Sequence, residues 1–175
     1  MNLGRQLLAV AVVAVAAAGL AGCTTSNDPS ETFPTFFGTW AGHTWEGSAS
    51  AFLASGGSAG DTLYIFASNP PSSGMMVRES LMARIVVHGT GAYPLGANAV
   101  RFDELVGGDV VSASYVTTPS STGTLTLSSY RGVGGLAEGK IEFDAVSSSP
   151  YGSYGPSASM RDAYFSVVVR AIPKS

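Results

Sequence analysis

The feature that most constrains the fold is a period-two alternation of apolar and polar residues that recurs from Trp45 to the C-terminus. Successive side chains of a β-strand point to opposite faces of the sheet, so this period is typical of strands that bury one face. The clearest case is residues 139–146, with Ile141, Phe143 and Ala145 on one face. Beyond the N-terminal segment no stretch repeats at the 3.6-residue period of a helix. The sequence therefore predicts strands.

Similar patterns mark seven further segments: 44–54, 62–68, 81–88, 99–105, 110–117, 122–129 and 160–172. Runs rich in Gly, Ser and Pro separate them, as turns do. Short strands with turns at near-regular spacing indicate a sandwich or a barrel. We predict an all-β fold, an antiparallel β-sandwich or partly open barrel of about eight to nine strands. A signal-peptide helix and a flexible tether precede it.

Composition agrees with this fold and argues against one class of partner. Gly, Ser and Thr are abundant while Lys and Glu are scarce, which suits turn-rich β architecture better than helices. The chain has 9 basic and 12 acidic residues, a formal net charge of −3. Because no basic stripe exists, we expect no nucleic-acid partner.

The first 22 residues are typical of an export signal. Arg5 supplies one positive charge, and residues 7–22 consist only of Leu, Ala, Val and Gly. A membrane-spanning helix needs about 18 to 20 apolar residues, whereas this run has 16 and ends in small residues. These features favour a cleaved signal peptide over a retained transmembrane anchor.

Leu20, Ala21 and Gly22 precede Cys23, the only cysteine in the chain. This tetrapeptide resembles the lipobox of bacterial lipoproteins, in which the cysteine is acylated and becomes the first residue after cleavage. The resemblance implies two or three acyl chains on Cys23, and durable anchoring needs at least two. A catalytic thiol would need a base in a formed pocket, and one cysteine forms no intrachain disulfide. We therefore expect Cys23 to be the lipid attachment site.

The lipobox resemblance divides the chain into three parts. Residues 1–22 are the lipoprotein signal peptide, residues 23–38 the acylated cysteine and flexible tether, and residues 39–175 a single β-domain. Thr24, rather than Asp, follows the cysteine, which by analogy with lipoprotein sorting in two-membrane bacteria favours the outer membrane. A polar coil of about twelve residues has an r.m.s. reach of roughly 20 Å, so the domain can stand off the lipid surface.

Short motifs in the mature chain resemble a family of uncharacterised bacterial lipoprotein domains. The shared features are a Trp-bearing first strand, a Gly-x-Tyr-x-Leu-Gly hairpin and a Gly-x-Phe-x-Phe-x-Ala strand, among others. In this sequence they correspond to Trp45, Gly91–Gly96, Gly123–Leu127, Gly139–Ala145 and Phe165. The resemblance implies a β-sandwich-like domain on a lipid tether and supplies no catalytic residues.

Two segments match catalytic or cofactor motifs by their letters alone. Residues 56–60 match the Gly-x-Ser-x-Gly nucleophile elbow around Ser58, with His88 the only downstream histidine. Residues 132–137 match a dinucleotide-binding fingerprint. Both motifs must open a helix, whereas a strand-like pattern follows each of them here. We predict turns at both segments, no catalytic residues and no cofactor.

The sequence also contains no recognisable set of metal ligands. His43 and His88 lie far apart, and a structural zinc site needs four ligands while a catalytic one needs three. The two histidines with a carboxylate such as Asp103 or Glu104 are the remaining alternative. In a strand these two acids point to opposite faces, which argues against a paired acid/base site. We therefore predict no metal site.

Residues 147–157 form the candidate binding loop. Tyr151 and Tyr154 lie among Gly, Ser and Pro, a mixture that binding loops use because Tyr gives a large contact area at low entropy cost. The alternative is an ordinary connection whose tyrosines pack on the domain. The same choice applies to four aromatic residues nearer the N-terminus, Phe33, Phe36, Phe37 and Trp40. We expect these to dock onto the core, because exposed aromatic patches are unfavourable in a soluble domain.

We therefore predict a lipid-anchored lipoprotein of the bacterial cell envelope, a non-enzymatic binding or structural module. Its membrane contact would be the N-terminal lipid, and its partner a protein or a glycan. One alternative is a lipocalin-like carrier of an apolar ligand, which needs a large apolar cavity inside a barrel. A less favoured alternative is an envelope hydrolase that uses Ser58 and His88.

Overall fold

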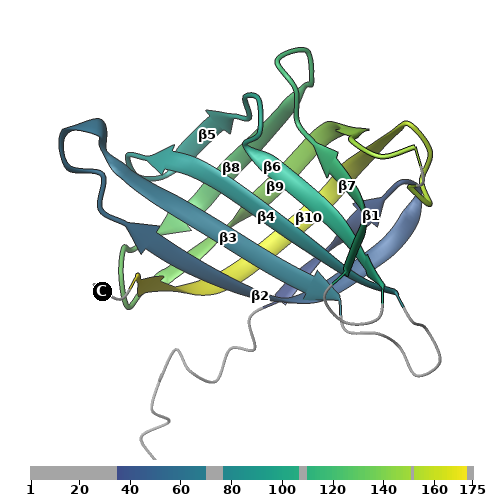
Figure 1. Cartoon of the computed structure of the whole chain (residues 1–175). Coiled ribbons are helices and arrows are strands. Elements are labelled where there is room, and N and C mark those ends of the chain that lie inside the picture. The colour runs from purple at the N-terminus through teal and green to yellow at the C-terminus, as the bar shows by residue number, and fades with distance from the viewer. Residues whose placement is uncertain (1–34, 70–76, 107–109, 151, 173–175) are drawn as a thin grey trace, which may run out of the picture.

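The structure, a computed structural model, describes residues 35–69, 77–106, 110–150 and 152–172 (Figure 1). Within these ranges lie ten strands and one short 3-10 turn at Gly57–Ala59. The strands are β1 (Thr35–Trp40), β2 (His43–Ala54), β3 (Asp61–Asn69), β4 (Val77–Val87), β5 (Gly91–Pro94), β6 (Val100–Val106), β7 (Val110–Val116), β8 (Gly123–Tyr130), β9 (Leu136–Ser147) and β10 (Ser157–Ala171). No helix in these ranges is long and apolar enough to cross a bilayer.

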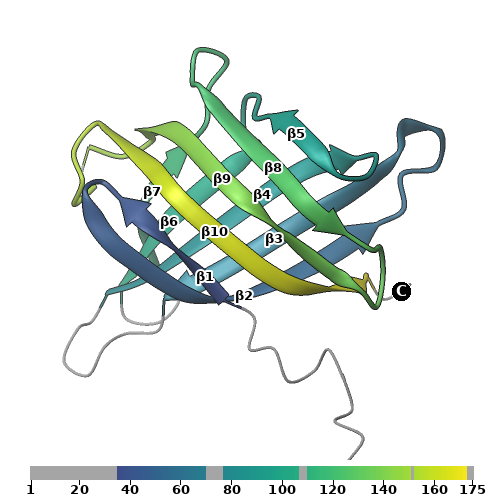
Figure 2. The ribbon, with the colours of Figure 1, turned by 180° about the vertical axis from the view of Figure 1, so that it is seen from behind.

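The strands form one sheet that curves into a ring (Figures 1 and 2). Its hydrogen-bonded neighbours run from β2 through β3, β4, β6, β7, β9 and β10, and β10 returns to β2. The closing contact is short and parallel, and it pairs Val169 with Ala51 and Arg170 with Phe52. β1 pairs with both β10 and β2. β8 pairs with β9, and β5 pairs with β8.

The all-β prediction is confirmed. Of the two alternatives within it, the described residues form a single sheet curved into a ring and not the two packed sheets of a sandwich. Two further parts of the prediction need correction. The sheet is mixed, because the β10–β2 pairing is parallel while the others are antiparallel. Ten strands replace the predicted eight or nine, since most of β1 lies in the predicted tether and β5 lies in the predicted turn at residues 91–96.

The boundary of the folded domain also differs from the predicted one. β1 begins at Thr35, so residues 35–38 belong to the sheet rather than to the tether. Phe36 and Trp40 are buried, as expected, whereas Phe37 is half exposed and stacks on Tyr164 with ring centroids 5.4 Å apart. Phe33 lies outside the described residues. Burial of Phe36 and Trp40 explains why this segment pairs with two strands.

Burial confirms the predicted inward faces of β4, β8, β9 and β10, except that Ala171, in phase with Phe165 at the end of β10, is exposed. Ile141, Phe143, Ala145, Leu81, Ala83, Ile85, Val87, Leu125, Leu127, Phe165, Val167 and Val169 all belong to one buried cluster. The outward residue of each alternating pair is exposed or half-buried. Each strand buries the apolar face of its period-two pattern, so these buried side chains fill the inside of the ring.

Aromatic rings occupy the interior near one end of the ring. Trp40 stacks on Phe102 across the interior, with centroids 4.1 Å apart and planes 21° apart. Tyr115 and Phe143 contact the same indole at 5.5 and 5.8 Å between ring centroids. Tyr154 contacts it at 6.0 Å. At this level aromatic side chains pack across the interior of the ring.

Candidate functional site

Two glutamates point into the ring beside this aromatic layer. Glu79 in β4 and Glu104 in β6 are direct cross-strand partners, so their side chains share a face. Glu104 is only 2% exposed. A buried carboxylate is costly unless hydrogen bonds satisfy its oxygens, and the neighbouring segment supplies the donors.

Residues 152–154 form a short connection that closes over the two carboxylates. The Ser153 backbone N–H donates to both Glu104 oxygens, at 3.1 and 3.2 Å, and its hydroxyl donates to Oε2 at 2.8 Å. The Trp45 indole N–H donates to Glu79 Oε2 at 2.8 Å, and the Tyr154 hydroxyl donates to Glu79 Oε1. Every oxygen of the pair thus accepts a hydrogen bond. The cluster fastens the 152–154 connection to the end of the ring.

Tyr154, one of the two predicted binding residues, is therefore part of this cluster. Its backbone N–H donates to the Tyr115 hydroxyl at 3.0 Å, and its ring contacts Trp40, Phe102 and Tyr115. Burial, followed by its hydrogen bond to Glu79, raises the pKa of Tyr154 well above its ordinary value. Burial likewise raises the pKa of Tyr115. Tyr154 packs on the domain, and Tyr151 lies outside the described residues.

The other candidate residues are not brought together. Ser58 is exposed in the 3-10 turn before β3, as predicted for a turn, and His88 is exposed after β4. No hydrogen bond joins these two side chains in the described part of the chain. His43 lies at the opposite end, where its ring centroid is 6.3 Å from that of Tyr154. The described residues contain no group of three or more His, Cys, Asp or Glu side chains that could hold a metal ion.

Asp103 and Glu104 point to opposite faces of β6, as predicted. Glu104 lies inside the ring, while Asp103 lies on the outer face and pairs with Arg101 at 2.8 Å between Nε and Oδ1. The Ser114 hydroxyl also donates to Asp103. Residues 132–137 form the β8–β9 turn and the start of β9, not the first turn of a helix. The lipobox residues Leu20, Ala21, Gly22 and Cys23 lie outside the described residues.

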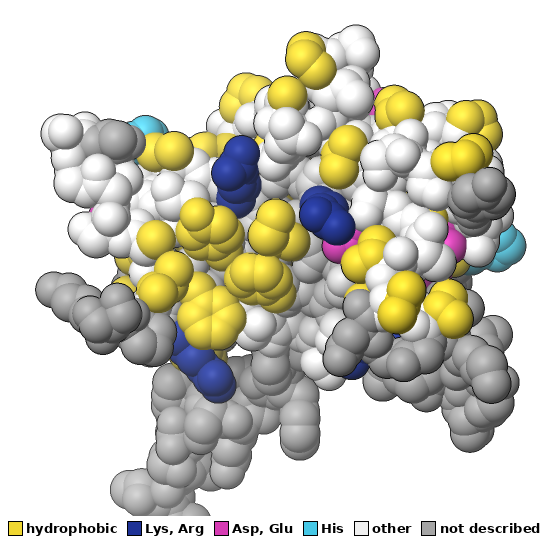
Figure 3. Space-filling view, in the orientation of Figure 1, with side chains coloured by type: hydrophobic (Ala, Val, Ile, Leu, Met, Phe, Trp, Pro, Cys, Tyr) yellow, Lys and Arg dark blue, Asp and Glu magenta, His cyan; other side chains and the backbone are white. Residues whose placement is uncertain are grey.

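The outer face of the sheet carries a second, solvent-facing cluster. We call it the aromatic platform, and it consists of Phe52, Tyr64, Phe66, Met82 and Val86. Phe66 is 38% and Val86 44% exposed, and the other three are half-buried. In the space-filling view, hydrophobic side chains gather over β3 and β4 with basic side chains at their border (Figure 3). An apolar cluster on the solvent side of a sheet is a candidate contact surface.

Arginines lie at the ends of two cross-strand rows on this face. One row runs from Arg170 through Phe52 and Tyr64 to Arg84. The next row runs from Ser50 through Phe66 and Met82 to Arg101. Arg84 and Arg170 are exposed, and neither guanidinium has an ion pair or hydrogen bond among the described residues.

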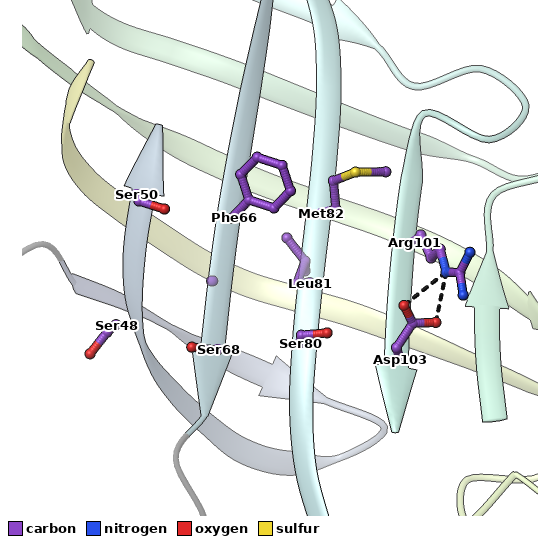
Figure 4. Close-up of a pocket in the computed structure, with 10 residues that line it drawn as sticks. Ser48, Ser50, Phe66, Ser68, Ser80, Leu81, Met82, Arg101 and Asp103 are labelled. Carbon is purple, nitrogen blue, oxygen red and sulfur yellow. Dashed lines mark hydrogen bonds and ion pairs between the residues drawn. The ribbon is translucent and has the colours of Figure 1, made fainter. Parts of the chain in front are cut away.

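A row of hydroxyls borders the platform on its other side. Ser48, Ser68 and Ser80 are successive cross-strand partners on β2, β3 and β4, and Ser80 is opposite Asp103. With Ser50 they line an open depression of about 400 Å³ that also includes Phe66, Met82 and Arg101 (Figure 4). Within the described ranges, the four serine side chains make no hydrogen bond. This surface combines ring faces, free hydroxyls and guanidinium groups.

The sequence carries one signal for the platform. Residues 62–68 are apolar on both faces, because Leu63, Ile65 and Ala67 alternate with Tyr64 and Phe66. A strand with one solvent-exposed face normally carries polar residues there. The excess of aromatic residues on that face marks this strand as part of a contact surface.

No protein family, curated protein or solved structure matches this chain. Its function therefore has to be inferred from its own residues.

Proposed function

We propose that the chain is a lipid-anchored lipoprotein of the bacterial envelope that acts as a non-enzymatic binding module. Cys23 is its acylated residue, residues 1–22 are its signal peptide, and the outer membrane is its location. The contact surface is the outer face of β2, β3, β4 and β6, where the aromatic platform lies. The anchor part of the proposal rests on the lipobox at Leu20–Cys23.

The proposed binding role rests on the aromatic platform and the arginines at its border. Phe66 and Val86 are 38% and 44% exposed, although a sheet face in water favours polar side chains. Arg84 and Arg170 flank the aromatic rings and have no ion-pair partner among the described residues. Aromatic residues and arginine are the side chains that contribute most to binding surfaces.

The tether would reach the domain beside this surface. β1 begins at Thr35, the cross-strand partner of Ser48, and Ser48 lines the depression next to Phe66. We place the contact surface here rather than on the 147–157 loop, because the Tyr154 hydroxyl donates to Glu79 and its ring packs on Trp40.

The anchor is tested by mass spectrometry and by membrane fractionation. Mass spectrometry of the N-terminus from extracted membranes is expected to show diacyl or triacyl Cys23, and a Cys23→Ser variant is expected in the soluble fraction. Membrane partition of that variant at the level of the parent would contradict the anchor.

The contact surface is tested by photo-cross-linking in intact cells. A photoreactive phenylalanine at Phe66 is compared with the same residue at Tyr164, which is also an exposed aromatic, 44% exposed, but lies on β10. We expect discrete cross-linked products from position 66 and few from position 164. Equal yields at the two positions would remove the platform as the contact surface.

A further inference from the structure

We propose that the aromatic platform binds an anionic oligosaccharide. This inference rests on the proposed function and specifies its partner. Three features of the outer face, the rings, the free guanidinium groups and the free hydroxyls, each match one part of such a ligand.

The rings supply a surface for the apolar face of a sugar. Tyr64 and Phe66 are nearly parallel, with planes 12° apart and centroids 6.3 Å apart, and Phe52 packs edge-on against Phe66. The faces of aromatic rings are electron-rich and attract the C–H groups of a sugar ring. Because the rings support one another, little entropy is lost when a ligand packs on them.

The arginines supply anion recognition. Arg170 and Arg84 are at the two ends of the row that contains Phe52 and Tyr64, about 14 Å apart across three strand spacings. A guanidinium group binds a carboxylate or phosphate through paired hydrogen bonds. Arg101 differs, because Asp103 already neutralises it. A ligand that carries acidic groups at its ends or along its length fits this spacing.

The serines supply hydrogen bonds to sugar hydroxyls. Ser48, Ser50, Ser68 and Ser80 lie beside Phe66 in the depression, and their hydroxyls have no partner among the described residues. Each can both donate and accept a hydrogen bond, as sugar hydroxyls do.

The same hydroxyls argue against a bilayer as the partner of this face. Insertion into lipid would remove four unpaired hydroxyls from water without replacing their hydrogen bonds, which is unfavourable. In addition, Phe66 is only 38% exposed and Phe52 and Tyr64 are half-buried, so neighbouring side chains cover much of each ring. A membrane-inserting surface instead buries a protruding apolar face in the headgroup and acyl region.

Affinity electrophoresis tests the inference. The full mature chain is run in native gels that contain polygalacturonate or chondroitin sulfate, and in gels that contain the neutral polymers dextran or laminarin. We expect the acidic polymers to retard the protein and the neutral ones to leave its mobility unchanged. Added salt is expected to weaken the retardation, because exposed ion pairs are screened.

Matched variants identify the surface. Arg84→Ser and Phe66→Ser are each expected to bind roughly tenfold more weakly, as the loss of one charge-assisted or stacking contact predicts. Arg131→Ser removes the same charge from the exposed β8–β9 turn and is expected to bind like the parent. Circular dichroism and urea unfolding midpoints verify that all three variants fold.

Three results would overturn the inference. They are no retardation in either acidic polymer, equal weakening by Arg84→Ser and Arg131→Ser, and binding of the chain to phosphatidylglycerol-containing vesicles with no binding to polysaccharide. If cross-links from position 66 persist in cells while no polysaccharide binds, the proposed function stands and the partner assigned here is wrong.

Discussion

The hydrogen bond from Tyr154 to Glu79 gives the most direct test of how the 152–154 connection is held at the end of the ring. A Tyr154→Phe substitution keeps the ring contacts with Trp40 and Phe102 and removes only the hydroxyl. A hydrogen bond to a charged acceptor contributes about 1.5–3 kcal/mol, so we expect the free energy of unfolding to fall by about 2 kcal/mol. For a domain of this size the melting temperature is expected to fall by about 6–10 °C.

Equilibrium urea unfolding measures this change. Trp40 and Trp45 are buried in contact with the same cluster, so tryptophan fluorescence reports its loss. The matched control is Tyr64→Phe, whose hydroxyl has no partner among the described residues and whose effect is expected to stay within about 0.5 kcal/mol. A double-mutant cycle with Glu79→Gln is expected to give a coupling energy of about 1–2 kcal/mol. If Tyr154→Phe costs no more than Tyr64→Phe, or if the coupling is zero, the role assigned to this contact is wrong.

Three further perturbations test the interior. Phe102→Ala is expected to lower the free energy of unfolding by about 3–5 kcal/mol in urea, because it removes the ring stacked on Trp40 and leaves a cavity. Gly38→Ala is expected to destabilise the β1–β10 contact, since a Cβ there would lie 2.6 Å from the Ala163 Cβ, and proteolysis of the N-terminal segment would report this. Burial raises the pKa of three tyrosines above the ordinary value of 10.0, namely Tyr115, Tyr130 and Tyr154. These tyrosines ionise at lower pH in the unfolded chain than in the folded one. Their contribution to the free energy of unfolding is therefore complete below about pH 10 and is lost as the pH rises further. Unfolding midpoints measured from pH 8 to 12 are expected to fall above pH 10, and less steeply in Tyr154→Phe.

The sequence predicted the strands better than their arrangement. Alternation identified the inward residues of β4, β9 and β10, because burial of one face imposes a period of two whatever the neighbouring strand is. It carried no information on pairing, and the parallel contact between Val169 and Ala51 joins segments more than 100 residues apart. β1 was missed because Phe36 and Phe37 are consecutive and a register shift between Phe37 and Thr39 interrupts the period.

The candidate surfaces were predictable to different degrees. Tyr154 was selected for its loop composition, yet composition does not show whether a tyrosine faces water or the core. That choice depends on Glu79, which lies 75 residues away in the sequence. The platform could not be predicted from the sequence. Phe52, Phe66 and Arg84 come together on one face only through the pairing registers of β2, β3 and β4.

The position of β10 has a consequence for biogenesis. This strand pairs with β1, β2 and β9, so the earliest and latest strands of the described chain complete the ring together. Contacts of such large sequence separation make folding slow. Until β10 emerges from the ribosome or the export machinery, residues 51–53 of β2 and the β10-facing edge of β9 stay unpaired. Truncation before Ser157 is therefore expected to yield an aggregating product rather than a smaller folded one.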